Sequence, residues 1–174
     1  ERRSEIAKNA AESRWSANLP EADFEGEFLI NNSVVSCAVL RDERRVITQS
    51  TFLKALGRSR SPKAGTGVLS TVDELPFFLQ AKVLKPFITS DLCKSTKPIF
   101  FRTRLGKKGV GYDAKLINEV ADVYLAYSNH CLAEKGVIPK RYEKMVFAAN
   151  AIKNAFAELG VIALIDEATG YQDV

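Results

Sequence analysis

The sequence predicts an α+β fold, in which an N-terminal antiparallel β meander is followed by short helices, a β hairpin and two longer amphipathic helices. Runs rich in β-branched residues come early in the chain, whereas helical periodicity dominates its last third. Strands therefore do not alternate with helices, as they would in a parallel sheet with crossover helices. The 174 residues are enough for one domain with a buried core.

The N-terminal segment, residues 1–18, is rich in alanine and basic residues. Ser4–Trp15 predicts a short helix, which at this length is marginal in water without a docking surface. We expect Asn18–Glu25 to be a linker. Residues 19–174 are expected to form a single α+β domain that is truncated at its C-terminus.

The meander is predicted from three β-branched runs, Glu27–Ile30, Ser33–Leu40 and Arg44–Gln49. Asn-Asn and Arg-Asp-Glu sequences between them are typical of turns. Thr51–Leu56 then predicts a short helix that ends at Gly57.

The middle of the chain is rich in turn-forming residues. Arg58–Ser70 has the glycine, serine and proline content of a loop. Between Pro76 and Pro86 we expect a short helix, followed by an irregular stretch. Lys97–Thr103 predicts a strand, and the glycine-containing segment after it predicts the turn of a hairpin.

Two longer helices are predicted after the hairpin. The first begins at Asp113 as N-cap and buries a stripe of six side chains, Leu116, Ile117, Val120, Tyr124, Tyr127 and Cys131. The second begins at Pro139, and its predicted inner stripe is Tyr142, Met145, Val146, Ala149, Ile152, Phe156 and Leu159. Lys153 is expected to point outward. Gly160 is expected to end this helix, and Val161–Ile165 fits either a helix or a buried strand.

Positive charge is concentrated in two segments. Residues 41–67 contain seven basic and two acidic residues, and residues 94–108 contain six basic residues and no acidic one. Basic loops of this kind can follow a phosphate backbone, although separate solvated loops have the same composition. The predicted nucleic-acid-binding residues are Arg44, Arg45, Arg58, Arg60, Lys63, Arg102, Arg104, Lys107 and Lys108.

Catalytic, metal and cofactor sites are not predicted. The three cysteines are far apart in sequence and there is one histidine, so neither a zinc site nor a disulfide framework is expected. The loop after Arg58 lacks the G-x-x-x-x-G-K-[ST] order of a phosphate-binding loop. No apolar run approaches the roughly 20 residues of a membrane span.

The C-terminal motif has an unassigned role, and its members are Asp166, Glu167, Thr169, Gly170 and Tyr171. Adjacent carboxylates diverge in a helix or a strand, which disfavours a catalytic pair. The apolar run before them predicts that both are buried, held by a turn amide or an arginine.

Five blocks of the chain resemble the phage p-sixty-three C-terminal-domain family. They are LPEADFEGEFLI, SCAVLRDERRVITQSTFLKALGRSR, FLQAKVLKPFI, GYDAKLINEVADVYL and GVIALIDEATGYQ, and RSEIAKNAAESRW is similar to the segment that often precedes them. The chain departs from the family in Ala126–Asn129, where members carry more basic residues, and in lacking the usual continuation after the last block.

The resemblance implies a mobile-element protein of phage or prophage origin and supplies no catalytic residues. We therefore expect a non-enzymatic, DNA-binding, antirepressor-like module in transcription regulation, located in the cytoplasm of a bacterial host, with no cofactor and no membrane partner. The first alternative is a protein-interaction or homo-oligomerisation module of a phage or plasmid protein. The second is a metal-dependent nucleic-acid enzyme that uses Asp166 or Glu167.

Overall fold

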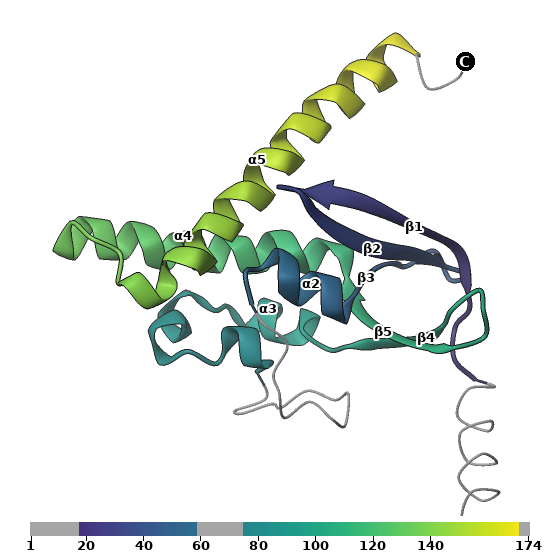
Figure 1. The fold of residues 1–174 in the computed structure, drawn as a ribbon, viewed down its shortest axis with the longest axis horizontal. Helices are drawn as coiled ribbons and strands as arrows, with labels where there is room; N and C mark the ends of the chain where they lie inside the picture. The colour runs from purple at the N-terminus through teal and green to yellow at the C-terminus, as the bar shows by residue number, and fades with distance from the viewer. Residues whose placement is uncertain (1–17, 59–74, 171–174) are drawn as a thin grey trace, which may run out of the picture.

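The computed structural model describes residues 18–58 and 75–170. Within them, one antiparallel sheet has the order β1-β2-β3-β5-β4 (Figure 1). Its strands are β1 (Ala22–Ile30), β2 (Ser33–Leu40), β3 (Arg45–Thr48), β4 (Ile99–Arg102) and β5 (Lys108–Asp113). The predicted α+β class, the meander and the hairpin are confirmed. The helix predicted at Ser4–Trp15 and most of the loop at Arg58–Ser70 fall outside the described residues.

The turns form where the sequence predicts them. Asn31 and Asn32 both have positive φ, 46° and 61°, which is the backbone of a two-residue hairpin turn that matches the strand twist. Glu43 has a φ of 65° in the β2–β3 turn, and Gly106 has a φ of 76° in the β4–β5 turn.

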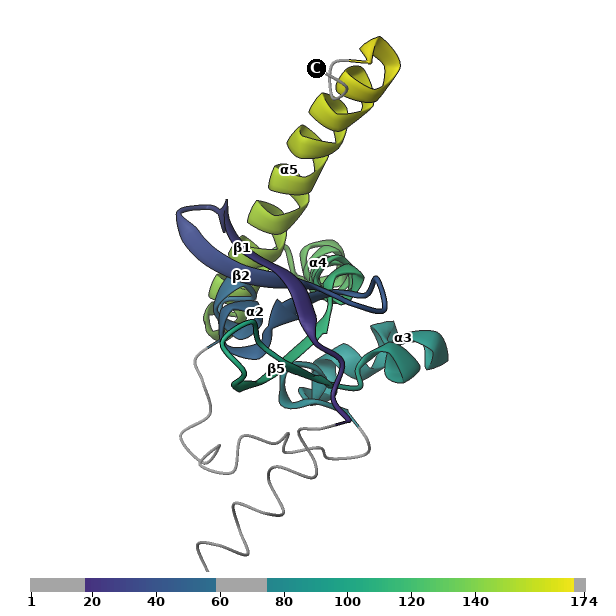
Figure 2. The same ribbon diagram turned by 90° about the vertical axis from the view of Figure 1, so that its right-hand side faces the viewer.

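The linker predicted at Asn18–Glu25 is wrong, because β1 already begins at Ala22. The Pro20 carbonyl accepts a hydrogen bond of 2.8 Å from the Arg102 amide, and Glu21 forms an isolated bridge with Arg102. Backbone pairing thus overrides the proline signal. The residues just before β1 therefore reach β4, and the sheet, which Figure 2 shows from the side, curls so that its two edges meet at this point.

The inside of the curl holds a small apolar cluster of Ala22, Ala38, Leu40, Val46 and Phe101. Gly109 makes this packing possible, since a Cβ on it would lie 2.6 Å from Cζ of Phe101. The opposite face of the sheet carries the main core.

Helices cover that face. They are α2 (Gln49–Ala55), the 3-10 helices η2 (Phe77–Leu79) and η3 (Lys82–Phe87), α3 (Ser90–Ser95), α4 (Ala114–Lys135) and α5 (Lys140–Thr169). The irregular stretch expected after Pro86 is wrong. Thr89 Oγ1 accepts a hydrogen bond from the Leu92 amide and caps α3.

Helix α4 begins as predicted, because Asp113 Oδ1 accepts a hydrogen bond of 2.9 Å from the Lys115 amide. All six residues of its predicted stripe are buried. One of them, Tyr124, donates a 2.7 Å hydrogen bond from its hydroxyl to the Phe78 carbonyl. Burial raises the pKa of Tyr124 to about 12, despite a smaller opposing effect of Arg58.

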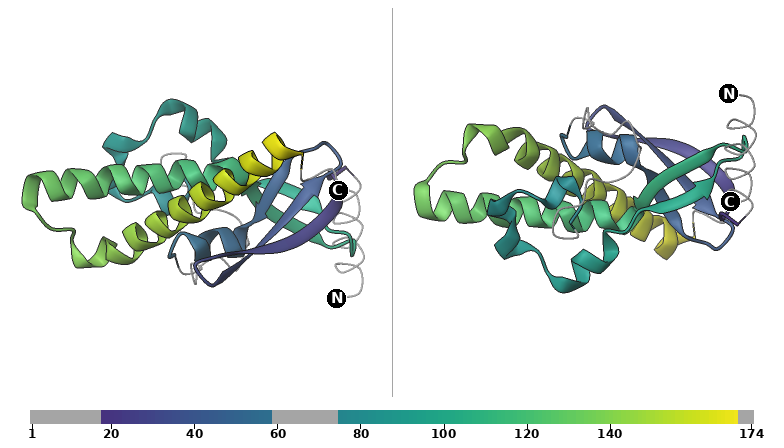
Figure 3. Two further views of the ribbon diagram at one scale, coloured as in Figure 1. Left: turned by 90° about the horizontal axis from the view of Figure 1, so that it is seen from above. Right: turned by 90° about the horizontal axis from the view of Figure 1, so that it is seen from below.

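Helix α5 lies beside α4 (Figure 3) and differs most from the prediction. It does not end at Gly160 but continues to Thr169. Val161–Ile165 is therefore helical, and the strand alternative is excluded. A glycine inside a helix costs about 1 kcal/mol relative to alanine, which weakens the helix without ending it.

Candidate functional site

The residues predicted to bind phosphates lie in several parts of the fold. They are Arg44 and Arg45 in the β2–β3 turn, Arg58 after α2, Arg102 at the end of β4, and Arg104, Lys107 and Lys108 around the β4–β5 turn. Arg60 and Lys63 fall outside the described residues.

The β2–β3 turn balances its own charge. Arg44 Nη2 lies 2.6 Å from Asp42 Oδ2, and this hydrogen-bonded pair lowers the pKa of the Asp42 carboxyl. Arg45 donates a hydrogen bond of 3.3 Å to the Glu43 carbonyl. Arg44 is therefore already paired with Asp42 before any phosphate binds.

The Glu21 carboxylate contacts an arginine from each of the two basic segments, residues 41–67 and residues 94–108. Glu21 Oε2 lies 2.9 Å from Arg41 Nη2, and Glu21 Oε1 lies 3.4 Å from Arg102 Nη1. The curl of the sheet therefore brings residues of both basic segments together, but it does so around a carboxylate. Their positive charge is partly neutralised there.

Arg58 is not directed at solvent. Its guanidinium carbon lies 5.6 Å from the centre of the Phe77 ring, and its Nε atom is buried. Packing of the stem and head against the core makes Arg58 a structural residue.

Three predicted cations remain exposed beside one another at the β4–β5 turn, namely Arg104, Lys107 and Lys108. Lys108 Nζ lies 4.9 Å from the centre of the Phe100 ring. Within the described residues, this turn is the part of the predicted basic surface that fits an approach to phosphates.

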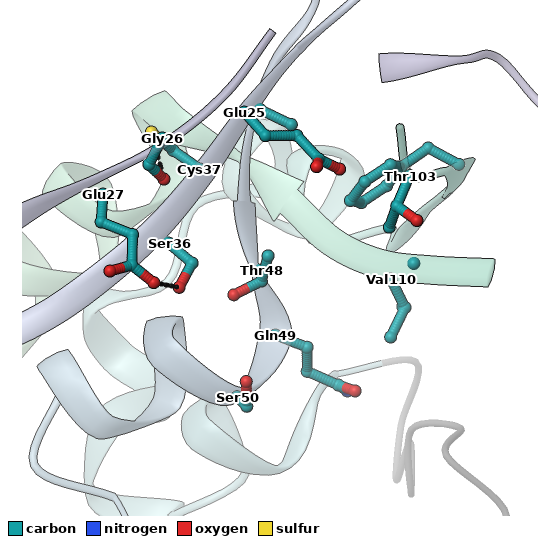
Figure 4. Close-up of a pocket in the computed structure, with 13 residues that line it drawn as sticks. Glu25, Gly26, Glu27, Ser36, Cys37, Thr48, Gln49, Ser50, Thr103 and Val110 are labelled. Atoms are coloured by element: carbon teal, nitrogen blue, oxygen red, sulfur yellow. Dashed lines mark hydrogen bonds between the residues drawn. The ribbon is translucent and has the colours of Figure 1, made fainter. Parts of the chain in front are cut away.

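The inside of the curl opens into a hollow of ≈ 560 Å³ (Figure 4). Its walls carry polar groups, among them Glu25, Glu27, Thr48, Gln49 and Thr103. Ser36 Oγ donates a hydrogen bond of 3.1 Å to Glu27 Oε1.

The thiol of Cys37, in the same hollow, donates a hydrogen bond to the Gly26 carbonyl. Burial raises the pKa of this thiol, which keeps it protonated and weakly nucleophilic. The described residues contain no cluster of three histidine, cysteine or acidic side chains that could hold a metal ion. The hollow therefore offers polar binding groups without an activated nucleophile.

Among the described residues, a cluster of exposed large apolar side chains lies at the end of α5. We call residues 140–156 the packed part of α5 and residues 157–169 its free end. Five large apolar side chains of the free end are exposed: Leu159 51%, Val161 58%, Ile162 49%, Leu164 67% and Ile165 57%. Figure 1 shows these turns projecting from the body of the molecule.

The packed part is held by both apolar and polar contacts. Met145, Val146, Ala149 and Ile152 are buried in the main core. Lys153 Nζ lies 2.6 Å from Asp122 Oδ1 and donates a hydrogen bond of 2.8 Å to Asn118 Oδ1. The prediction that Lys153 points outward is wrong, because it bridges α5 to α4.

The burial predicted for the C-terminal motif is also wrong. Asp166 is only half-buried and follows exposed apolar residues. Thr169 Oγ1 donates a hydrogen bond of 2.8 Å to the Ile165 carbonyl, and Gly170 has a φ of 70°, so these two residues end the helix. The Glu167 side chain and Tyr171 fall outside the described residues.

The charge at the free end opposes the helix dipole. The last turns of α5 contain Asp166 and Glu167 and no basic residue. The C-terminus of a helix carries partial negative charge, which favours cations there. A partner surface that places cations beside the free end is therefore bound more favourably than one without them.

The stretch Lys140–Asp166 is long and apolar enough to cross a membrane by length and composition. Its first half, however, is part of the protein core, and the free end spans only about 20 Å at 1.5 Å per residue. The hydrocarbon core of a membrane is about 30 Å thick, so the free end by itself is too short to cross it.

A sequence signal for the free end existed. After Phe156 the apolar residues no longer recur at helical spacing but occupy all sides of the helix. A helix that is apolar on all sides is buried on all sides in the functional protein.

No family model, curated protein or solved structure matches this chain. The resemblance to the phage p-sixty-three C-terminal-domain family accordingly stays a prediction, and the function is inferred from the surfaces of the molecule itself.

Proposed function

We propose that the chain is a protein-interaction module, in which the α+β domain presents the free end of α5 to a protein partner. The observation that carries this proposal is the exposure of Leu159, Val161, Ile162, Leu164 and Ile165 on one projecting segment. Contiguous apolar surface of this kind marks interaction sites in soluble proteins. The proposal includes no reaction, and it assigns the protein to the cytoplasm of a bacterial host, as the resemblance implies.

Burial of these side chains is the driving force. Removing apolar surface from water contributes about 25 cal/mol per Å². The packed part fixes the direction of the helix, which lowers the entropy cost of ordering the free end on binding. A rigid helix that presents an apolar segment fits the helix-in-groove mode of recognition.

A photo-crosslinking residue in place of Leu159 tests the proposal in cells. It is expected to form adducts with protein, and these are expected to disappear when Ile162→Glu is added, because a buried unpaired charge is costly. The same probe at exposed Asn129 on α4 is the control. Absence of any adduct at position 159 contradicts the proposal.

A second candidate is nucleic-acid binding through the β4–β5 turn, favoured by the exposed group of Arg104, Lys107 and Lys108. Three phosphate contacts predict a slope of log K against log salt of about −2.7 on double-stranded DNA. Replacing Lys107 and Lys108 by alanine is expected to reduce that slope by about 1.8. An affinity that salt does not change excludes this candidate.

A further inference from the structure

We propose that the outer edge of β1 binds an extended peptide segment of a partner protein, in which basic residues alternate with apolar ones. The segment adds a strand to the sheet beside β1, with its basic side chains next to Glu25 and Glu27. This edge is a different surface from the free end of α5, so the inference does not depend on what the free end binds.

The outer edge of β1 has backbone groups without partners. Ile30 and Ser33 flank a two-residue turn and form a hydrogen-bonded pair, so every second residue of β1 is bonded to β2. The amides and carbonyls of the residues between them, Glu25, Glu27 and Leu29, point away from β2. Within the described residues, these groups form no hydrogen bond. Such an edge is a template for a further strand.

Strand β4 does not fill this edge. Its contact with the start of the chain's first strand is an isolated bridge between Glu21 and Arg102. Strand β4 ends at Arg102, whereas β1 continues to Ile30. Beyond the bridge, Glu25 Oε1 accepts a hydrogen bond of 3.2 Å from the Arg104 amide, which is a side-chain contact and leaves the backbone edge unpaired.

Glu25 and Glu27 give the edge a preference for positive charge. Both line the hollow inside the curl of the sheet, as Figure 4 shows. Their carboxylates accept hydrogen bonds from uncharged groups, the Arg104 amide and the Ser36 hydroxyl. Within the described part of the chain, neither glutamate forms an ion pair. A basic side chain on this face therefore meets two carboxylates that have no cationic partner.

The hollow suits a long basic side chain. Its walls include apolar Phe101 and Val110 as well as the hydroxyl groups of Thr48 and Thr103. Lysine and arginine pack an apolar stem against such a surface and keep the charged head among polar groups. The hollow, of ≈ 560 Å³, thus offers both kinds of contact beside the unpaired edge.

The other face of β1 favours apolar side chains. Phe24 is 69% exposed on that face, and Phe28 packs partly buried against the main core. Between them, a Cβ at Gly26 would meet nothing within 4 Å, so the space beside the strand is open. Apolar side chains pair well with aromatic ones across neighbouring strands. Because side chains alternate between the two faces of a strand, the peptide that fits alternates basic and apolar residues.

A second copy of β1 does not meet these requirements. Two β1 strands paired along this edge would bring the carboxylates of Glu25 and Glu27 from both copies together, and like charges on neighbouring strands repel. Charged side chains on an edge strand are a common protection against such self-pairing. The edge therefore favours a basic strand from another protein.

Isothermal titration with a peptide in which valine and lysine alternate tests the inference. The control peptide has the same composition with its lysines adjacent to one another, and we expect it to bind about 10-fold more weakly. Replacing Glu25 and Glu27 by glutamine keeps their hydrogen bonds and is expected to weaken the alternating peptide about 10-fold. The matched control replaces exposed Glu134 and Glu143 by glutamine, which changes the net charge equally and should leave the affinity unchanged.

The backbone part of the inference has its own test. Leu29→Pro removes an amide that points away from β2, a position where an edge strand tolerates proline, so thermal melting should stay close to that of the parent. It is expected to weaken the alternating peptide about 10-fold, since it removes a donor from the edge, whereas Leu29→Ala should not.

N-methylated peptides test the same point without changing the protein. Methylation at the lysines and methylation at the valines place the methyl groups on opposite edges of the peptide strand. Only the form whose methyl groups face β1 is expected to lose binding. Three outcomes overturn the inference: no binding of the alternating peptide, equal binding of the alternating and the control peptide, and equal effects of the two methylation patterns.

Discussion

The packed part and the free end of α5 are parts of one continuous helix, yet their surroundings are opposite. In the packed part, apolar side chains recur every three or four residues and enter the core, whereas polar ones face outward or bridge to α4. In the free end, apolar side chains surround the helix and stay exposed. The comparison teaches that apolar content does not identify burial; the period of the apolar residues does.

The largest expected effect is a difference in stability between a substitution in the packed part of α5 and one in its free end. Ile152→Ala, at a fully buried position, is expected to destabilise the chain by about 2–5 kcal/mol through the cavity it leaves. Ile162→Ala is expected to change the stability of the monomer by less than about 0.5 kcal/mol. Urea unfolding at a concentration where the chain is monomeric measures both. Equal losses would mean that the free end is packed within its own chain.

Alkaline pH should destabilise the main core, in which Tyr124 is buried. Because the pKa of Tyr124 is about 12 in the folded chain and about 10 when unfolded, the stability is complete below pH 10 and falls as pH rises toward 12. The expected loss is roughly 2 kcal/mol. Urea midpoints between pH 9 and pH 12 give the slope, which Tyr124→Phe is expected to reduce. The free end contains no group that titrates in this range.

A smaller effect should come from the bridge that ends the packed part. Lys153→Ala removes the contacts with Asp122 and Asn118 and is expected to cost about 1 kcal/mol. Lys140→Ala, at an exposed position of the same helix, is the control and is expected to be neutral. Thermal melts of the two variants decide it, and identical melts would show that the bridge does not anchor α5.

The smallest effect should concern the free end alone. Gly160→Ala is expected to stabilise this segment by about 0.5–1 kcal/mol, because a Cβ at Gly160 meets nothing within 4 Å and alanine favours the helix. Amide hydrogen exchange is expected to slow in residues 157–169 and stay unchanged around Ile152. Faster exchange in the variant would show that Gly160 has a role beyond helix propensity.

Much of the fold follows from local sequence. Asn31-Asn32 determines a two-residue turn because asparagine tolerates positive φ, and Asp113 determines a helix start because its carboxylate caps a free amide. The stripe on α4 was readable since each of its residues faces one side of the helix. These features depend on neighbours a few positions apart, so the sequence contains them directly.

Long-range contacts decided the rest. The contacts of Pro20 and Glu21, just before β1, with Arg102 of β4 cannot be predicted from the segment around Pro20, because their partner lies about 80 positions away. The same holds for the site. Sequence alone grouped the basic residues by their proximity along the chain, but the curl of the sheet placed Glu21 between Arg41 and Arg102. Lys153 contacts Asp122 because α4 lies beside this part of α5, whereas Ile162 is exposed because it lies beyond that contact. Both outcomes depend on how the two helices pack, which the sequence alone does not give.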